Sequence, residues 1–280
     1  MVANNIHKPI AFEWKDSECK INITFSVEDD LAISLPKAPY SGFSIENSPS
    51  QNTINKIVAE LRKKLLEKGV KKAIIRQRPV FQPNPVYQLL HDALILHEFE
   101  YTQEINQFVS LDQELERKLH IMQLRKIKKC QHAELTFQKE PSDRVEEVHA
   151  FLAKCRIQQG LNINIDNHAL EELFLQLPLN YECYTIRNKE NEIMASTILV
   201  IVNSQVVYNY LPGFDRNFKS LSPLSFLLYQ LYELLRNRNF QIFDLGISSI
   251  QGNIQKGLFE YKKRMGAQCS DRFIYELNIK

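Results

Sequence analysis

The stretch of sequence that decides the fold is Leu221–Ser248, which reads LSPLSFLLYQLYELLRNRNFQIFDLGIS. Ser222 and Pro223 open an amphipathic segment, and serine is a preferred N-cap residue while proline fits the first helical position. This segment predicts a helix that reaches about Arg238. The short apolar run Gln241–Gly246 that follows predicts a buried strand. A helix that leads directly into a buried strand is typical of an α/β protein.

The residues on both sides of this stretch extend the same alternation. Ser142–Gly160 and Asn167–Leu177 carry apolar residues at helical spacing, and Ser142 is placed to cap the first helix. Two short polar breaks separate three β-rich runs, a pattern typical of an antiparallel meander. The three runs are Tyr181–Arg187, Ile193–Val202 and Gln205–Leu211. After the quoted stretch, Asn253–Met265 predicts a helix and Arg272–Ile279 a last strand.

Part of this order also occurs in the N-terminal half. The predicted helix, strand, helix and strand are Thr53–Lys68, Val70–Arg76, Asn84–Leu96 and Glu100–Ser110. They recur in the C-terminal half at an offset of about 169 residues, although few residues are identical. We therefore expect an α/β fold with a mixed sheet, built from two tandem units at 1–111 and 112–280, the second more complete. The alternative is that helix–strand alternation is simply common in α/β proteins.

Between the two copies lies Asp112–Gln131, which predicts one long helix with a basic side. The basic residues are Arg117, Lys118, Arg125, Lys126, Lys128 and Lys129. Such a cluster can contact phosphates, and RNA binding would then weaken steeply with salt. The more common role of such a run is the solvated face of a connecting helix, and we favour this second interpretation.

The composition excludes several classes of protein. The net charge of +2 over 280 residues creates no global field that would favour DNA or a membrane surface. The longest apolar run, Ile193–Val202, is shorter than the roughly 20 residues of a membrane helix, so we expect no membrane insertion. The five cysteines are scattered without a CxxC pair. We therefore expect neither disulfides nor a metal site, and a cytoplasmic location.

Three segments resemble the GNAT acyltransferases, in particular their FemAB-like branch. They are Leu111–Gln131, the Ser-Pro helix and Asp-Leu-Gly strand of Leu221–Ser248, and Lys256–Gly266, which reads KGLFEYKKRMG. The resemblance implies a duplicated GNAT fold and an N-acyltransferase. Such an enzyme moves an acyl or aminoacyl group from acyl-CoA or aminoacyl-tRNA to an amine on a small molecule or peptide.

The sequence departs from the common GNAT pattern at two places. The glycine-containing pyrophosphate loop is absent, since Arg216–Ser222 reads RNFKSLS. Because glycine lets the backbone approach a phosphate closely, acyl-CoA would have to bind in a non-standard way. The tyrosine that many GNAT proteins carry four residues before Gly266 is replaced by Lys262, as in the FemAB-like branch. The lost loop leaves one alternative open, a non-catalytic ligand- or partner-binding protein on the same fold.

Acyl transfer requires a polarised carbonyl, a positioned amine and a stabilised leaving group. In a GNAT fold, the strands Gln205–Leu211 and Gln241–Gly246 diverge and leave a cleft. We expect unpaired backbone N–H groups near Tyr210 and Asp244 to polarise the carbonyl there, which would explain the lack of a catalytic triad. Tyr208 shares a strand face with Tyr210.

Seven residues are candidates for the site. The candidate catalytic residues are Lys262, Tyr261 and Asp244, and the candidate cofactor-binding residues are Tyr210, Ser220, Ser222 and Ser248. Lys262 would neutralise a phosphate or developing negative charge, Tyr261 would donate a proton, and Asp244 would orient the amine or accept its proton. The serine hydroxyls would add donors near the N-terminus of the Ser222 helix, which favours anions. The alternatives are a lysine stem that covers the core, a packed tyrosine, and an aspartate bonded to nearby backbone.

Overall fold

The computed structural model describes most of the chain, which divides into two compact units. The described residues are 9–17, 19–35, 40–112, 114–163 and 165–279. Unit 1 comprises Met1–Asn106, Ile247–Gln255 and Ser270–Lys280, and unit 2 comprises Gln107–Gly246 and Lys256–Cys269. Helices and strands alternate in both, as expected for a mixed α/β protein. Within the described ranges, no helix combines the length and apolar character that crossing a membrane requires.

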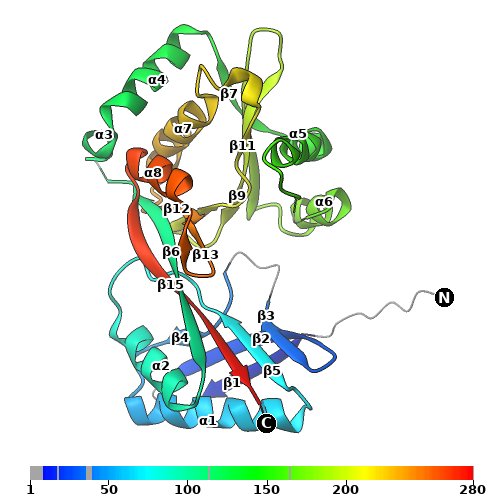
Figure 1. Cartoon of the computed structure of the whole chain (residues 1–280), viewed down its shortest axis with the longest axis vertical. Helices are drawn as coiled ribbons and strands as arrows, with labels where there is room; N and C mark the ends of the chain where they lie inside the picture. Colours follow the sequence, from blue (N-terminus) through cyan, green and yellow to red (C-terminus); the bar gives the residue numbers. More distant parts are fainter. Residues whose placement is uncertain (1–8, 18, 36–39, 113, 164, 280) are drawn as a thin grey trace, which may run out of the picture. The chain divides into compact units, whose positions relative to one another are not determined.

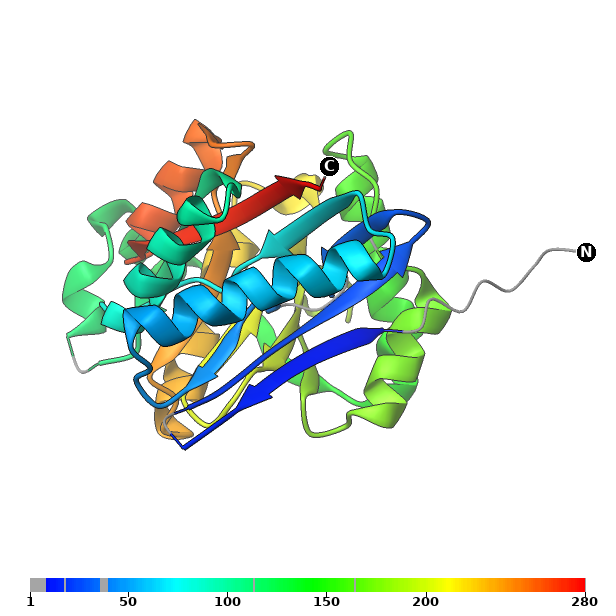
Figure 2. The ribbon, with the colours of Figure 1, turned by 90° about the horizontal axis from the view of Figure 1, so that it is seen from below.

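Unit 1 is a mixed sheet covered by two helices. Its strands are β1 (Ile10–Lys15), β2 (Lys20–Glu28), β3 (Leu31–Ser34), β4 (Ser44–Glu46) and β5 (Lys72–Arg76), with parts of β6 (Glu100–Ser110) and β15 (Gln268–Asn278) and a small β13–β14 hairpin (Ser249–Ile250, Asn253–Ile254). Figure 2 shows α1 (Gln51–Glu67) lying across the sheet, and α2 (Pro85–Leu96) packs against α1. Every second residue of β2 is buried, because one face of the sheet receives the helices.

Unit 2 contains the more complete set of elements. Its strands are β7 (Thr136–Glu140), β8 (Tyr181–Arg187), β9 (Ile193–Ile201), β10 (Val206–Asn209), β11 (Gly213–Phe214) and most of β12 (Ile242–Ile247). Its helices are α3 (Leu115–Lys118), α4 (Ile121–His132), α5 (Val145–Ile157), α6 (Asn167–Gln176), α7 (Pro223–Asn237) and α8 (Lys256–Arg264), with 3-10 turns η1 (Ser142–Arg144) and η2 (Arg216–Phe218). The strand order is β12-β10-β9-β8-β7. The expected antiparallel meander of β8, β9 and β10 is confirmed.

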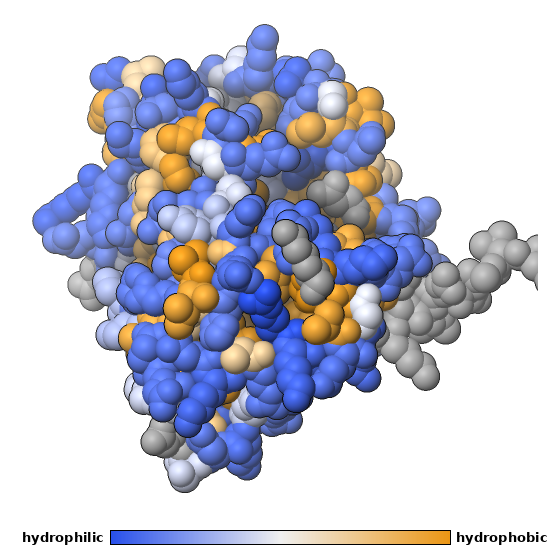
Figure 3. Space-filling view, turned by 60° about the horizontal axis from the view of Figure 1, so that its bottom comes forward, coloured by the Kyte–Doolittle hydropathy of each residue, from blue (hydrophilic) through white to orange (hydrophobic). Residues whose placement is uncertain are grey.

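The sheet of unit 2 is buried on both faces. Figure 1 shows α5 and α6 on one side of its strands and α4 and α7 on the other. Tyr184 and Ile186 of β8 join the core with α7, while Tyr181 and Cys183 join the core with α5 and α6. Two covered faces explain why every residue of β8 and all but the end residues of β9 are buried, including polar ones. On the face that Figure 3 presents, hydrophobic side chains form small separate areas among hydrophilic ones.

Contacts with other segments shorten two of the predicted helices. The segment Asp112–Gln131 is not one helix, because Leu119 and His120 are extended between α3 and α4. The backbone N–H of His120 donates to the carbonyl of Arg264 (2.9 Å), and its ring Nδ1 accepts from Met122 N (3.2 Å). The segment Asn253–Met265 becomes helical only at Lys256, because Asn253 and Ile254 pair as β14 with β13.

Of the two predicted serine caps, Ser142 is wrong, and Ser222 occupies the expected N-cap position but makes no capping bond with its side chain. Ser142 belongs to η1, whose start has no side-chain capping bond, and α5 begins only at Val145. Ser222 precedes α7 as expected, but its backbone is left-handed (φ 57°) and its side chain does not cap the helix. Its hydroxyl instead donates to the carbonyl of Lys219 (3.4 Å). The Ser-Pro pair therefore marks the start of α7 through proline rather than through the serine side chain.

Candidate functional site

Strands β10 and β12 are parallel neighbours that pair over only three residues each. The last pair is Tyr208 with Asp244. Beyond it, the chain of β10 continues along β9, because Tyr210 N donates to the carbonyl of Ile198 (2.9 Å). The β10–β12 register ends there, whereas β12 extends to Ile247. The divergence predicted near Tyr210 and Asp244 is therefore present.

Two backbone N–H groups near this divergence, those of Tyr210 and Gly246, already donate hydrogen bonds. The N–H of Tyr210 is bonded to Ile198, and the N–H of Gly246 donates to Oδ1 of Asp244 (2.9 Å). The prediction of unpaired N–H groups is wrong for these two amides, because the Asp244 side chain folds back onto its own strand.

Helix α8 holds the side chain of Lys262 at the end of β12. It is the residue of α8 that is buried, with 7% of its surface exposed. Its Nζ donates to the carbonyl of Gly246 (2.9 Å). Burial lowers the pKa of Lys262 to about 8, against the opposing charge of Asp244. A lysine whose stem merely covers the core would keep its ammonium in water, which is not the case here.

Gly246 and Tyr208 complete the surroundings of this lysine. Gly246 has a left-handed backbone (φ 79°), and a Cβ atom there would lie 3.3 Å from Cε2 of Tyr208. The Tyr208 ring therefore lies against the strand end, with the Tyr210 ring 6.1 Å away between centroids. Neither Gly246 nor Tyr208 was among the candidate residues. The Asp-Leu-Gly run and the shared face of the two tyrosines were the signals in the sequence.

Tyr261 is half-buried and linked to other helices. Its hydroxyl lies 3.5 Å from Oγ of Ser225 in the first turn of α7, and Ser225 donates to Oε1 of Gln123 in α4 (3.0 Å). Burial raises the pKa of Tyr261. Its contacts therefore support a role in joining α4, α7 and α8.

The candidate serines lie in two different places. Ser220 and Ser222 belong to the loop that leads into α7, where the carbonyl of Ser220 accepts from Nζ of Lys129 (3.2 Å). Ser248 is a buried residue of unit 1, and its N–H donates to the carbonyl of Ile105 (2.7 Å). The structure therefore brings Asp244 and Lys262 together around Gly246, and leaves Ser248 in the other unit.

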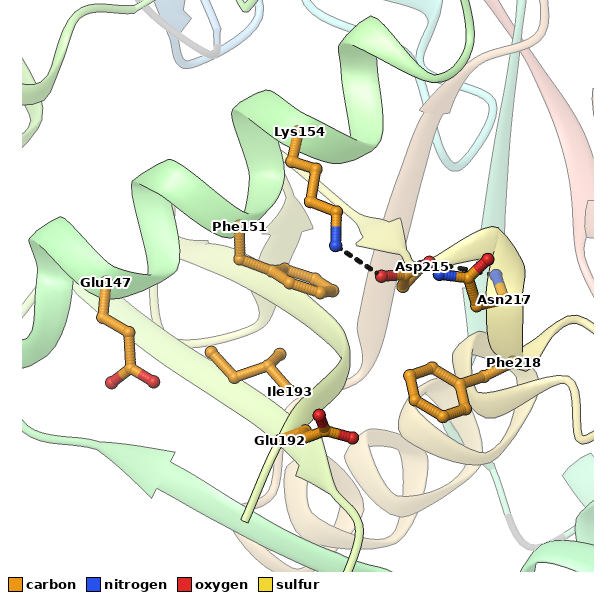
Figure 4. Close-up of a pocket in the computed structure, with 8 residues that line it drawn as sticks. All are labelled: Glu147, Phe151, Lys154, Glu192, Ile193, Asp215, Asn217 and Phe218. Carbon is orange, nitrogen blue, oxygen red and sulfur yellow. Dashed lines mark hydrogen bonds and ion pairs between the residues drawn. The ribbon is translucent and has the colours of Figure 1, made fainter. Parts of the chain in front are cut away.

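A separate hollow of about 360 Å³ lies in unit 2 between α5, the start of β9 and η2 (Figure 4). Its lining residues are Glu147, Phe151, Lys154, Glu192, Ile193, Asp215, Asn217 and Phe218. Lys154 pairs with Asp215 (2.8 Å), and this bond lowers the pKa of Asp215. Glu147 pairs with Arg187 (3.0 Å). Across the part of the chain that the structure describes, no group of three or more His, Cys, Asp or Glu side chains is arranged to hold a metal ion.

The fold is that of known GNAT proteins. FemX superposes with a TM-score of 0.68 at 13% identity, covering 97% of this chain and 88% of its own. The C-terminal domain of a putative lysylphosphatidylglycerol synthetase from Agrobacterium fabrum gives 0.61 at 13%, with 91% and 80% covered. A tandem GNAT protein from the clavulanic acid biosynthesis pathway gives 0.58 at 9%, with 97% and 84% covered. The expected tandem GNAT fold, with its FemAB-like resemblance, is thereby confirmed.

The sequence itself matches a family model described as acetyltransferase (GNAT) domain over residues 122–263, just over half of the chain. The chain therefore belongs to this family. It is an acyltransferase that moves an acyl group from an activated donor to an amine. The match includes Tyr208, Asp244, Gly246 and Lys262. No curated protein matches the sequence significantly.

Proposed function

We propose that unit 2 transfers an aminoacyl group from aminoacyl-tRNA to an amine of a small molecule or peptide, with Lys262 as the catalytic residue. The observation that carries this proposal is the ammonium group of Lys262, buried where β10 and β12 diverge in a GNAT unit. A buried charge acts more strongly than one in water, because the surrounding dielectric is low.

The reaction follows from the protonation states of three groups. The neutral amine attacks the ester carbonyl, and negative charge develops on the carbonyl oxygen, where the Lys262 ammonium stabilises it. The C–O bond then breaks, the leaving ribose oxygen takes a proton from Lys262, and the amide C–N bond remains. The proton lost by the attacking nitrogen restores the ammonium. A pKa of about 8 suits this exchange, since a general acid works best near the working pH.

Asp244 is a positioning residue in this proposal. Its carboxylate holds the N–H of Gly246, and this bond fixes the left-handed turn whose carbonyl accepts from Lys262. Its negative charge also raises the pKa of Lys262 and so favours the ammonium form. Tyr208 limits the space beside the turn, because its ring lies where a side chain at position 246 would be.

Two observations favour aminoacyl-tRNA over acyl-CoA as the donor. The loop Arg216–Ser222 has no glycine that would let its backbone wrap a pyrophosphate. The fold is also similar to FemX and to a protein named as a putative lysylphosphatidylglycerol synthetase, whose name contains an aminoacyl group. The FemAB-like resemblance implies the same class of donor.

The donor is tested by incubating the protein with tRNA charged with one radiolabelled amino acid at a time. A panel of free amino acids and lysine-containing peptides serves as acceptors, and acetyl-CoA is tested in parallel. We expect label to move from tRNA into a product that resists mild base, as an amide does and an ester does not. Transfer from acetyl-CoA alone would overturn the proposed donor. No transfer from either donor, together with a ligand-induced rise in melting temperature, would favour the non-catalytic alternative.

A further inference from the structure

Helix α4 presents a row of cations to solvent. Arg125, Lys128 and Lys129 are exposed and spaced by three and four residues, so they share one helix face. The opposite face is buried through Ile127 and Cys130. The packing of α4 therefore fixes which way its basic residues point.

These cations have no carboxylate partner among the described residues. No ion pair involves Arg125, Lys128 or Lys129 in that part of the chain. Three acidic residues that flank α4 in sequence are engaged elsewhere. They form the pairs Asp112–Lys118 (2.5 Å), Glu114–Arg117 (3.1 Å) and Glu134–Lys189 (2.8 Å). With 35 basic and 33 acidic residues in the whole chain, this imbalance is local.

The loop before α7 extends the basic surface. It is attached to α4 by two bonds, from Lys129 Nζ to the carbonyl of Ser220 (3.2 Å) and from Cys130 Sγ to the carbonyl of Leu221 (2.8 Å). The loop contributes Arg216 and Lys219, which are both exposed. The acidic residue before them, Asp215, is held by Lys154. We call the five cations Arg125, Lys128, Lys129, Arg216 and Lys219 the α4 stripe.

We propose that the α4 stripe binds the phosphate backbone of a base-paired RNA arm, the acceptor arm of the aminoacyl-tRNA donor. This inference rests on the proposed function. Uncompensated lysine and arginine side chains on a rigid helix are the groups that contact a nucleic-acid backbone. The loop that carries Arg216 and Lys219 leads into the N-terminus of α7, a 15-residue helix whose positive end adds to the attraction.

The packing of α4 favours RNA over an anionic membrane. A helix that lies on a membrane exposes its apolar face to the lipid and its basic face to water. In α4, Ile127 and Cys130 are buried in the protein core, so the exposed face is mainly basic. Ile121 and Met122 are exposed at its first turn only.

The test measures binding of a fluorescent RNA hairpin with a seven-base-pair stem and a single-stranded 3′ end, over a range of salt concentrations. Five phosphate contacts predict a slope of about −4 for log K against log salt. The triple variant Arg125→Gln/Lys128→Gln/Lys129→Gln should reduce this slope to about −2 and weaken binding roughly tenfold or more near physiological salt. The matched control Lys56→Gln/Lys63→Gln/Lys68→Gln removes the same charge from α1 or its end in unit 1, and should leave the slope unchanged.

Three results would overturn the inference. They are an unchanged slope in the stripe variant, an equal loss in the control variant, and stripe-dependent binding to phosphatidylglycerol vesicles without binding to RNA. Catalysis separates this inference from the proposed function. The stripe variant should lose transfer from full-length aminoacyl-tRNA but keep the wild-type rate with an aminoacylated dinucleotide. Transfer that depends on Lys262 but not on the stripe overturns only the inference, whereas stripe-dependent RNA binding without any transfer overturns only the proposed function.

Discussion

A parallel strand pair lies in each unit, β3 with β5 in unit 1 and β10 with β12 in unit 2, and the two units differ at the place where that pair ends. In unit 1, β3 pairs with β5 as far as Ile33 and Ile74. In unit 2, β10 pairs with β12 as far as Tyr208 and Asp244. These two pair ends correspond to each other, so Ile74 is the counterpart of Asp244, and Arg76, two residues later, is the counterpart of Gly246. The residues at the turn in unit 2 thus have different counterparts in unit 1.

The strand end in unit 1 is closed by its own side chains. Ser34 Oγ accepts from the N–H of Arg76 (2.8 Å), and Ser41 Oγ donates to the carbonyl of Arg76 (2.8 Å). The Gln77 side chain accepts from Phe43 N (2.9 Å) and donates to Phe43 O (3.1 Å). Helix α2, the next helix after β5 in the chain, buries only apolar side chains, those of Val86, Leu90, Ala93 and Leu94. These backbone and side-chain groups at the end of β5 are therefore hydrogen-bonded to one another.

The comparison supports placing the proposed chemistry in unit 2. Burying an ammonium group is unfavourable unless it is well paired, and apolar residues at such positions often stabilise a protein more. Unit 1 has isoleucine at its strand end and only apolar buried residues in α2, whereas unit 2 has aspartate at its strand end and the buried lysine of α8. A lysine kept in a position that lowers its pKa is typical of a functional site.

The largest effect should come from giving α8 an apolar residue in place of its buried lysine, since α2 of unit 1 buries only apolar residues. Lys262→Ala, which truncates the side chain, and Lys262→Met, which keeps the volume, should lower kcat/KM for aminoacyl transfer about 100- to 1000-fold, the range for loss of one oxyanion-stabilising donor. Lys262→Met should not lower the melting temperature, because a buried charge is removed. The control is Lys263→Met, at the exposed next residue. More than a tenth of wild-type activity in Lys262→Met would show that the lysine is structural.

The second effect is a pH dependence of stability. Burial lowers the pKa of Lys262 in the folded chain to about 8, below the 10.5 of a solvated lysine, so the unfolded chain binds more protons between these values. The contribution of Lys262 to stability is therefore lowest below pH 8 and rises towards pH 10.5, by about 3 kcal/mol in total. Urea unfolding of wild type and Lys262→Met from pH 7 to 10 isolates it, because tyrosine and cysteine titrations cancel in the difference. A difference that stays constant with pH would contradict the burial of this ammonium.

The order of elements could be predicted from the sequence because it depends on local patterns. The bounds of β6 and β8 agree with Glu100–Ser110 and Tyr181–Arg187, since polar breaks limit alternating or apolar runs. Lys262 was found through a family motif at the end of α8. The helix lengths that were predicted wrongly depend on contacts between segments far apart in the sequence. One example is the bond from the N–H of His120 to the carbonyl of Arg264, which lies where the predicted helix is interrupted.

The details of the site depend on contacts that no periodicity encodes. Gly246 is required by the ring of Tyr208, which lies 38 positions earlier in the chain. The Asp244 carboxylate occupies the Gly246 amide, and a strand pattern gives the strand but not the partner of each N–H group. That the sequence repeat divides the chain into 1–111 and 112–280 stays a prediction. The compact units are defined by packing, and they assign Ile247–Gln255 and Ser270–Lys280 to unit 1.

Gly246 itself predicts a smaller effect on stability. Gly246→Ala should lower the free energy of unfolding by about 2 kcal/mol, because alanine is strained at this positive φ and its Cβ would crowd Tyr208. Gly257→Ala in the first turn of α8 is the control, since a Cβ there meets no atom within 4 Å and alanine favours helix. Urea unfolding of both variants measures the contrast. Equal stabilities would mean that the turn at Gly246 relaxes without loss.

The smallest effect compares the starts of two helices. Ser50 caps α1 through a bond from Thr53 N to its Oγ (3.2 Å), whereas Ser222 makes no such bond and has a left-handed backbone. Ser50→Ala should therefore lower the free energy of unfolding by about 1 kcal/mol. Ser222→Gly should raise it by up to about 1 kcal/mol, since glycine adopts positive φ without strain.

The same Ser222→Gly variant distinguishes a structural role of Ser222 from a role in donor binding. If its hydroxyl serves only the local loop, aminoacyl transfer should continue at the wild-type rate while urea unfolding shifts to higher concentration. If the hydroxyl contacts a donor phosphate near the N-terminus of α7, the KM for aminoacyl-tRNA should rise although the protein is more stable. A lower stability of Ser222→Gly would contradict both outcomes, because it would mean that the serine side chain holds the start of α7 after all.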